Sequence, residues 1–408
     1  MRIALFGGSF DPVHYGHLEL IRGAIASGSV DIVIVIPTVN NNFKRGRALT
    51  PAPYRYYMTD AVISSEFKKN VFVSDIEFSF DGITYTVNTL RQITKDSYII
   101  PFLIKNGIPG ERAAERHSFF WLCGSDILRD FDKWHKPAEV LSYAALLCAK
   151  REGDESDLLY NCSRLKELFG CDIALFNMKG IDQASSDIRN RNDISALPGA
   201  CRDFIATHDL YNAIRSLDNC SDEACDLYYR SAVRMYPTLS SKRLLHTLNV
   251  GLLAAKLAHD HGIDADKALI AGALHDSAKE YPIEEQRSMA REISGDMFDH
   301  EKLLHSPAGA YIAMHDYGIT DQEILDAITY HTTGRGGATT LDKIVYLADK
   351  IEPSRTYTDL TEMRRLAPVD LDEAVRLCAI SVADKFRRKG RDLHPVTSDF
   401  MRELGIVL

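Results

Sequence analysis

The hydrophobic periodicity of this chain changes once, near residue 214, and that change constrains the fold more than any other feature. Before it, short β-branched apolar runs alternate with segments of helical period, which predicts a parallel α/β sheet. After it, segments of helical period follow one another, and no convincing strand interrupts them. The clearest strands are expected at 2–6 and 30–36, and the clearest helices at 16–27, 53–66, 243–260, 264–275, 306–316, 321–331 and 340–351.

The chain length supports the same division, because 408 residues exceed the size of one typical domain. The polar, acidic stretch Ser216–Asp226 is the candidate junction. We therefore expect an α/β domain over residues 1–215 and an all-α helical bundle over residues 216–408.

Composition limits the partners that such a chain can have. The formal net charge of -9 offers no basic footprint for a nucleic acid, so a role with nucleotides must be confined to a pocket. The opening MRIALFGGSF lacks the features of a signal peptide, and no apolar stretch approaches the ~20 residues of a membrane span. The eight cysteines form no CxxC pair and suit reduced thiols. We expect a cytoplasmic protein without nucleic-acid or membrane partners, and the sequence does not indicate its oligomeric state.

The segment GGSFDPVHYGH, at 7–17, follows the first expected strand and opens the first expected helix. Backbone N–H groups at such a turn and the helix N-terminus face one point, and this geometry suits a phosphate. His14 and His17 lie three residues apart, so both imidazoles can donate hydrogen bonds to phosphate oxygens and to charge that develops in a transition state. A glycine pair or two histidines alone would be weak evidence, but the whole string is specific.

This string resembles the HxGH nucleotidyltransferase superfamily, which implies a Rossmann-like parallel sheet. Four further strings occur in the order found in nicotinate mononucleotide adenylyltransferases and narrow the resemblance to that family: IPTVNNNFKR (36–45), TYTVNTL (84–90), CGSDILRDFDKWHK (123–136) and ASSDIRNR (184–191). The resemblance covers nearly all of residues 1–213. Phosphopantetheine adenylyltransferases are the rival within the superfamily, and Trp134 and the TYT string make them the weaker match.

The resemblance implies transfer of the adenylyl group of ATP to nicotinate mononucleotide, with Mg²⁺ on the triphosphate and no covalent intermediate. The charge-stabilising set would be His14, His17, Lys44 and Arg189. The substrate-binding set would be Gly7, Gly8, Ser9 and Phe10 at the phosphate turn, Thr86 at the nicotinate end, Asp126 near the adenosine, Trp134 on the pyridine ring, and Ser185 and Ser186 on the ATP phosphates. Two departures from the family pattern, VNNNF at 39–43 and Ala184, leave open whether the mononucleotide is acidic or amidated.

In the second half, the dipeptide His-Asp indicates a metal site only where its context is apolar. It occurs four times, and at 275–276 it ends the apolar helix KALIAGALHDSAK. Burying an imidazole beside a carboxylate is costly without a partner, which a metal ion would supply. His246 and Asp349 lie in two other apolar helices, and His305 and His331 complete the set. Separate helices that each contribute an inward N or O ligand are how a helical bundle builds a metal site.

The order H…HD…H…H…D resembles the HD phosphohydrolase superfamily. The strings RLLHTLNV, AGALHDSAK, HTTG and YLADKIEPSR, with LHP near the C-terminus, look closest to bacterial HD-type symmetrical diadenosine-tetraphosphate hydrolases. The resemblance implies cleavage to two ADP by a water whose pKa a metal lowers. It also implies that His246, His275, Asp276 and Asp349 hold iron or another divalent transition metal, that His305 and His331 bind a second metal or contact phosphate, and that Lys279 and Arg355 grip the polyphosphate.

Three functions compete at this point: a bifunctional enzyme, a transferase whose HD module only senses or binds nucleotides, and a scaffold in which neither site turns over. All six histidine and aspartate positions of the HD pattern are present, and so is Lys279. This favours catalysis, because a nucleotide sensor does not need a complete metal shell.

Overall fold

The computed structural model of the chain describes residues 1–39, 49–150, 155–178, 185, 188–189, 194–356 and 359–407. The chain forms two compact units, Met1–Ile205 and Ala206–Leu408, each with a core of its own. The boundary expected at residue 215 lies close to this division.

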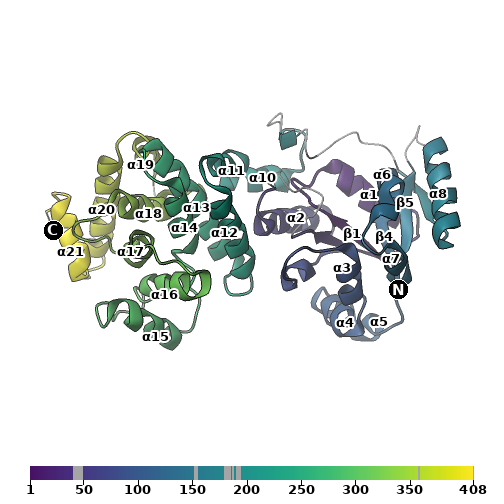
Figure 1. The fold of residues 1–408 in the computed structure, drawn as a ribbon, viewed down its shortest axis with the longest axis horizontal. Helices are drawn as coiled ribbons and strands as arrows, with labels where there is room; N and C mark the ends of the chain where they lie inside the picture. The colour runs from purple at the N-terminus through teal and green to yellow at the C-terminus, as the bar shows by residue number, and fades with distance from the viewer. Residues whose placement is uncertain are drawn as a thin grey trace. The chain divides into compact units, whose positions relative to one another are not determined.

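The first unit is built on a parallel sheet of six strands in the order β3-β2-β1-β4-β5-β6. Figure 1 labels β1, β4 and β5 of this sheet. The strands are β1 (Arg2–Gly8), β2 (Ile32–Pro37), β3 (Val71–Val73), β4 (Ser118–Cys123), β5 (Ala145–Lys150) and β6 (Ala174–Asn177), and every neighbouring pair is parallel. All six residues of β2 are buried, as expected for a strand that is covered on both faces of a parallel sheet. The predicted α/β class is therefore confirmed.

Helices cover this sheet and complete its core. The first two, α1 (Tyr15–Ala26) and α2 (Ala52–Glu66), begin and end within a residue of their predicted bounds. The other helices among the described residues of this unit are α3 (Thr86–Ile93), α4 (Asp96–Lys105), α5 (Gly110–Ala113), α6 (Ser125–Asp130), α7 (Pro137–Tyr143), α8 (Glu155–Phe169) and α10 (Gly199–His208), which spans the division between the units, with short 3-10 turns at Ile76–Ser79 and Phe131–Lys133. Apolar residues of α3, α4, α7 and α8 share one core with alternate residues of the strands.

In the second unit, every regular element that the structure describes is helical, which confirms the predicted all-α class. After α11 (Leu210–Ile214) and the 3-10 turn Arg215–Asn219 come α12 (Asp222–Arg234), α13 (Ser241–Asp260), α14 (Ala265–Leu274), α15 (Ile283–Ser294), α16 (His305–Tyr317), α17 (Gln322–Tyr330), α18 (Thr340–Ile351), α19 (Thr361–Leu366), α20 (Leu371–Arg388) and α21 (Pro395–Glu403). None of the helices in the described part of the chain has the length and apolar character needed to cross a membrane.

A glycine pair brings the two central helices of this unit close together. A Cβ atom on Gly272 of α14 would lie 2.8 Å from the Cα atom of Gly251 on α13. Real Cβ atoms do not approach a backbone so closely, so a larger residue would force the helices apart. This close crossing brings the α13 face that carries His246 to the end of α14, where His275 and Asp276 follow.

Candidate active sites

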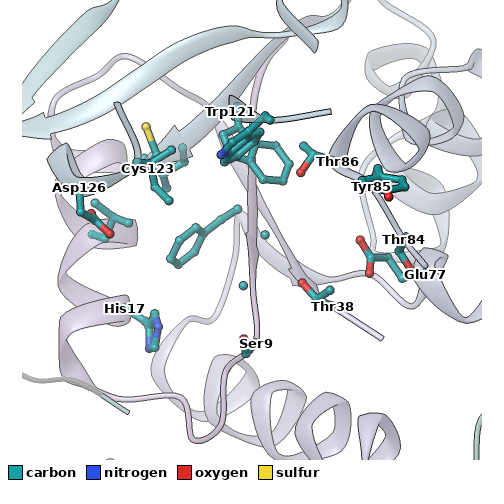
Figure 2. Close-up of a pocket in the computed structure, with 18 of the residues that line it drawn as sticks. Ser9, His17, Thr38, Glu77, Thr84, Tyr85, Thr86, Trp121, Cys123 and Asp126 are labelled. Atoms are coloured by element: carbon teal, nitrogen blue, oxygen red, sulfur yellow. The ribbon is translucent and has the colours of Figure 1, made fainter. Parts of the chain in front are cut away.

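The first site lies at the carboxyl ends of the strands, where ligands bind in open α/β sheets. A cavity of about 390 Å³ opens there, and residues from the ends of β1 and β4 line it. Figure 2 shows Ser9 and His17 on one side of this cavity and Thr84, Tyr85 and Thr86 on the other. The cavity thus lies between the phosphate turn and the segment expected at the nicotinate end.

Some residues of the phosphate turn line the cavity, and one is buried in the core. Gly7, Gly8 and Ser9 line the cavity. A Cβ atom on Gly7 would lie 2.5 Å from the Trp121 ring, so only glycine lets the end of β1 pass this side chain. Phe10 is buried, and its ring packs against that of His17 with the ring centroids 4.9 Å apart. Phe10 therefore supports His17 from within the core.

His14 and His17 come together at the start of α1. Their ring centroids lie 3.8 Å apart, and the backbone N–H of His14 donates to Nδ1 of His17 over 3.2 Å. Because Nδ1 of His17 accepts this bond, the proton of its neutral ring is on Nε2. Burial lowers the pKa of His14 to about 4, so this ring is neutral near pH 7. Nε2 of His17 is therefore held in a fixed orientation from which it can donate to a phosphate.

Thr86, Asp126 and Trp134 all line the same cavity. Thr86 is the first residue of α3, and Asp126 lies in the first turn of α6. Trp134 packs edge-on against Trp121, with the ring centroids 6.0 Å apart and the planes at 86°. The structure thus brings together the three residues that were expected at the two ends of the substrate.

Ser185 and Arg189 approach the same turn from the end of the first unit. The Ser185 hydroxyl donates to the Pro12 carbonyl over 3.0 Å, and the Arg189 guanidinium donates to the Asp11 carbonyl. Arg189 also lies 3.7 Å from the Asp11 carboxylate, which is fully buried. Both side chains hold the turn that leads into His14. Two other predicted residues, Lys44 and Ser186, lie outside the described residues.

Two buried charged residues that were not predicted fix the cavity walls. Arg55 is 1% exposed and donates to the carbonyl groups of Ser9 and Val39, over 2.8 and 3.2 Å. Glu77 lines the cavity and accepts from the backbone N–H of Val39 at 3.0 Å and from the Thr89 hydroxyl at 2.8 Å. Burial raises the pKa of Glu77 to about 7. No local pattern marked these residues, because their partners are distant in sequence.

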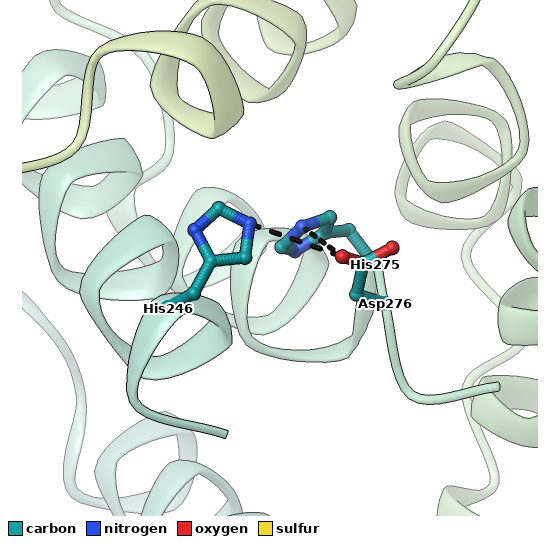
Figure 3. A group of neighbouring side chains, drawn as sticks. All are labelled: His246, His275 and Asp276. Atoms are coloured by element: carbon teal, nitrogen blue, oxygen red, sulfur yellow. Dashed lines mark ion pairs between the residues drawn. The ribbon is translucent and has the colours of Figure 1, made fainter. Parts of the chain in front are cut away.

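The second site gathers all six predicted histidine and aspartate side chains of the helical unit. Each of the six is buried. Two groups of ligand atoms lie close enough to hold a metal ion, and Asp276 belongs to both. They are His246, His275 and Asp276, drawn in Figure 3, and Asp276, His305 and His331.

Asp276 turns one oxygen toward each group. Its Oδ2 lies 3.5 Å from Nε2 of His275 and 3.8 Å from Nε2 of His246. Its Oδ1 lies 3.3 Å from Nε2 of His305 and 3.6 Å from Nε2 of His331. Burial opposes ionisation, yet interactions with His275, His331 and His305 hold the pKa of Asp276 well below its usual range. A carboxylate in this place can serve either group or bridge both.

Asp349 completes the first group. Its Oδ1 lies 3.0 Å from Nε2 of His246 and 3.8 Å from Nε2 of His275. Lys350, whose Nζ lies 2.5 Å from the other oxygen, and His246 hold the pKa of Asp349 well below its usual range, although burial opposes them. Asp349 thus lies beside the first group, and the four residues predicted to hold a metal are near one another.

Hydrogen bonds leave the histidine nitrogens available on the side that faces the cluster. Nδ1 of His275 lies 2.6 Å from the Gly272 carbonyl, and Nδ1 of His331 lies 2.7 Å from the Ile328 carbonyl. A carbonyl can only accept, so these Nδ1 atoms carry the protons and Nε2 keeps a lone pair. In the described part of the chain, no hydrogen-bond partner reaches Nε2 of His275 or Oδ1 of Asp276. Unpartnered buried nitrogen and oxygen atoms that converge in this way fit a divalent transition metal.

Cationic side chains surround the ligands. Lys279 donates to the His305 ring, with its Nζ 2.9 Å from Nε2. The Arg355 guanidinium lies 2.9 Å from Oδ1 of Asp349. Arg243, which was not predicted, lies 2.5 Å from Oδ2 of Asp276. These cations add positive charge where a polyphosphate would have to approach.

Glu352 supports His246 from behind and was not predicted either. It is fully buried, and its Oε1 lies 3.0 Å from Nδ1 of His246. Asn249 donates to the second oxygen over 2.9 Å, and the Ser354 hydroxyl donates to the first over 2.6 Å. Burial opposes ionisation, yet His246 and Ser354 lower the pKa of Glu352 to about 2. An ionised carboxylate on Nδ1 directs the Nε2 lone pair of His246 toward the cluster.

Comparison with known proteins gives a family for each half of the chain. Residues 5–216 match the family Cytidylyltransferase-like, and residues 243–354 match the HD domain. A Mycoplasma genitalium protein named "Probable nicotinate-nucleotide adenylyltransferase/Ap4A hydrolase" is 28% identical over 382 residues, which are 92% of this chain and 93% of that protein.

Two further relatives each match one half. A Clostridium novyi protein named "Probable nicotinate-nucleotide adenylyltransferase" is 31% identical over 216 residues, 51% of this chain and 97% of that protein. A Bacillus subtilis protein named "Bis(5'-nucleosyl)-tetraphosphatase, symmetrical" is 44% identical over 140 residues, 34% of this chain and 75% of that protein. The chain is therefore an enzyme that belongs to the cytidylyltransferase-like family through its first half and carries an HD domain in its second.

Proposed function

We propose that the first unit transfers the adenylyl group of ATP to nicotinate mononucleotide, giving deamido-NAD and pyrophosphate. The observation that carries the proposal is the pairing of a fixed His17 donor with Thr86 and Trp134 across one cavity of about 390 Å³. The Clostridium novyi relative bears the name of this activity.

In this reaction, the mononucleotide phosphate attacks the α-phosphorus of ATP in line with the leaving pyrophosphate. The chain positions both substrates and neutralises charge, because phosphoryl transfer of this kind needs no covalent catalyst. His17 donates through Nε2 to a phosphate oxygen, His14 packs against it, and the N–H groups of the turn face the same point. Lys44 and Arg189 would add positive charge, Ser185 and Ser186 would bind ATP phosphates, and Mg²⁺ would accompany the triphosphate.

For the second unit, we infer metal-dependent hydrolysis of diadenosine tetraphosphate to two ADP. The supporting observation is the convergence of six buried histidine and aspartate side chains with cations around them. The Bacillus subtilis relative is named as a symmetrical tetraphosphatase. One water is consumed: its oxygen bonds to one of the two central phosphorus atoms, and the bond from that phosphorus to the oxygen bridging the two breaks. The second ADP leaves with the bridging oxygen, and the protons of the water are released to the solvent.

His246, His275, Asp276 and Asp349 would hold iron or another divalent transition metal, which supplies Lewis acidity and a more acidic water. Lys279, Arg243 and Arg355 would bind the phosphates and neutralise the charge that the leaving ADP gains. His305 and His331 share Asp276 with the first group, so they can hold a second ion or contact phosphate.

Product analysis tests both halves. The full-length protein should convert ATP and nicotinate mononucleotide to deamido-NAD, and the metal-loaded protein should convert diadenosine tetraphosphate to ADP alone. Release of ATP and AMP would exclude the symmetrical cut. Metal binding without cleavage of any dinucleoside polyphosphate would favour the nucleotide-sensing alternative.

A further inference from the structure

A cavity of about 700 Å³ opens beside the metal-ligand cluster of the second unit. Thr332 and Lys350 line it, and both also contact the cluster. The Thr332 hydroxyl lies 3.0 Å from Nε2 of His331, and Nζ of Lys350 lies 2.5 Å from Oδ2 of Asp349. The cavity therefore adjoins the candidate metal site, and its volume falls within the about 300–1,000 Å³ of small-molecule sites.

One part of this cavity is apolar, although the cluster beside it is highly polar. Leu360, Met363, Val382, Phe386 and Leu393 line that part. A polyphosphate alone would gain nothing from such a surface, because it is charged along its whole length. A nucleoside, in contrast, has a flat base that stacks on an aromatic ring. Phe386, near the end of α20, offers the ring.

Several cationic side chains are also part of the lining. Lys302, Lys385 and Arg391 line the cavity, and within the described residues none of them forms an ion pair. On the same helix as Lys385, Arg387 is paired with Asp384 at 2.8 Å. The lining also contains two aspartates, Asp299 and Asp392, so these three cations exceed the carboxylates by one even without Lys350, which is paired with Asp349. Unpaired cations beside an apolar surface suit an anion that carries an organic group.

The LHP string noted in the sequence forms part of the lining. His394 lies 3.1 Å from the Met297 carbonyl through Nε2, and its Nδ1 accepts from the backbone N–H of Val396. Its ring stacks on Phe298 with centroids 5.4 Å apart. His394 thereby ties the segment after α15 to the start of α21, so these two sides of the cavity are held by specific contacts.

We propose that this cavity binds one nucleoside diphosphate half of the dinucleotide substrate, with the base against Phe386 and the phosphates directed past Lys350 to the metal ligands. The inference rests on the proposed hydrolase function and names the part of the substrate that each region holds. If the cavity holds one nucleoside and its two phosphates, the P–O bond beyond the second phosphate lies at the metal-ligand cluster. The cavity would in this way select the symmetrical cut.

Binding of ADP to the metal-depleted, full-length protein tests the inference without catalysis. Calorimetric titrations would be made with excess deamido-NAD present, the ligand proposed for the first unit. We expect Phe386→Ala to raise Kd for ADP by about tenfold through lost stacking. Lys385→Gln should also weaken binding, whereas Lys389→Gln, at the end of the same helix but not in the lining, should not. Unchanged ADP binding by Phe386→Ala and Lys385→Gln would overturn the inference.

A second variant covers the case in which Phe386→Ala fails to fold. Ser381→Trp should fill the cavity from a half-buried position and abolish ADP binding, while the metal content per chain stays that of the wild type. The two proposals also fail separately. Tetraphosphate cleavage with an unchanged KM in Ser381→Trp would overturn the cavity inference alone. ADP binding through the cavity in a protein that cleaves no dinucleoside polyphosphate would overturn the hydrolase function and leave the cavity as a nucleotide site.

Discussion

A single hydrogen bond, from the backbone N–H of His14 to Nδ1 of His17, determines which nitrogen of His17 can donate to a phosphate. We expect His17→Ala to lower dinucleotide synthesis by about 10²-fold or more, because a donor to developing charge is lost. His17→Asn can keep an acceptor for the His14 N–H and should be equally impaired. Both would be measured as kcat/KM, with thermal unfolding of the first unit in the same variants as the control for folding. Near-normal synthesis by His17→Asn would assign His17 to capping of α1 alone.

At the second site, the carboxylate of Glu352 lies 3.0 Å from Nδ1 of His246 and would act on a bound metal through this ring. We predict that Glu352→Gln weakens metal binding by about 10–100-fold, since the carboxylate that orients the ligand ring is gone. Ser354→Ala is the matched control, because Ser354 bonds to the same carboxylate without touching His246. Metal content at fixed free metal concentration would be compared among the three proteins. Equal metal content in Glu352→Gln and the wild type would restrict Glu352 to packing.

At the scale of elements, Glu77 joins the end of β2 to α3. The stability that is lost by burying its carboxyl group depends on pH. The folded state holds the proton more tightly, because burial raises the pKa from 4.5 to about 7. The folded state therefore loses stability as pH rises through this range, by up to roughly 3 kcal/mol. Glu77→Gln is neutral throughout, so its stability relative to the wild type should increase between pH 5 and pH 8. Unfolding curves at both pH values would measure this, and a constant difference would contradict it.

Elements with a strong local period were predictable, and those defined by distant partners were not. The apolar period placed α13, α14, α16, α17 and α18 nearly at their observed bounds. It gave no sign of β3, which has three residues, because so short a strand exists only through its pairing with β2. Likewise, the histidines and aspartates of the HD pattern were predicted from polar residues in apolar segments, whereas Glu352 meets His246 across 106 positions and nothing local marks it.

At the scale of the whole molecule, each unit has a core of its own, so a local defect in one site should leave the other intact. Asp276→Ala should lose bound metal and tetraphosphate hydrolysis, because Asp276 belongs to both ligand groups. Deamido-NAD synthesis by the same protein should stay at the wild-type level. Asp276→Asn keeps the volume and separates loss of charge from loss of packing. Full hydrolysis by a metal-free Asp276→Ala protein would refute the metal mechanism.

The close packing of Trp121 and Trp134 has an optical consequence. These are the two tryptophans of the chain, and both line the first cavity. Indole emission from the full-length protein therefore originates beside one substrate pocket only. Titration with ATP or mononucleotide should change this emission, because the rings lose contact with water. Binding of a nucleotide to the helical unit should leave the emission unchanged. The chain thus carries an intrinsic fluorophore pair that distinguishes its two reactions without any label.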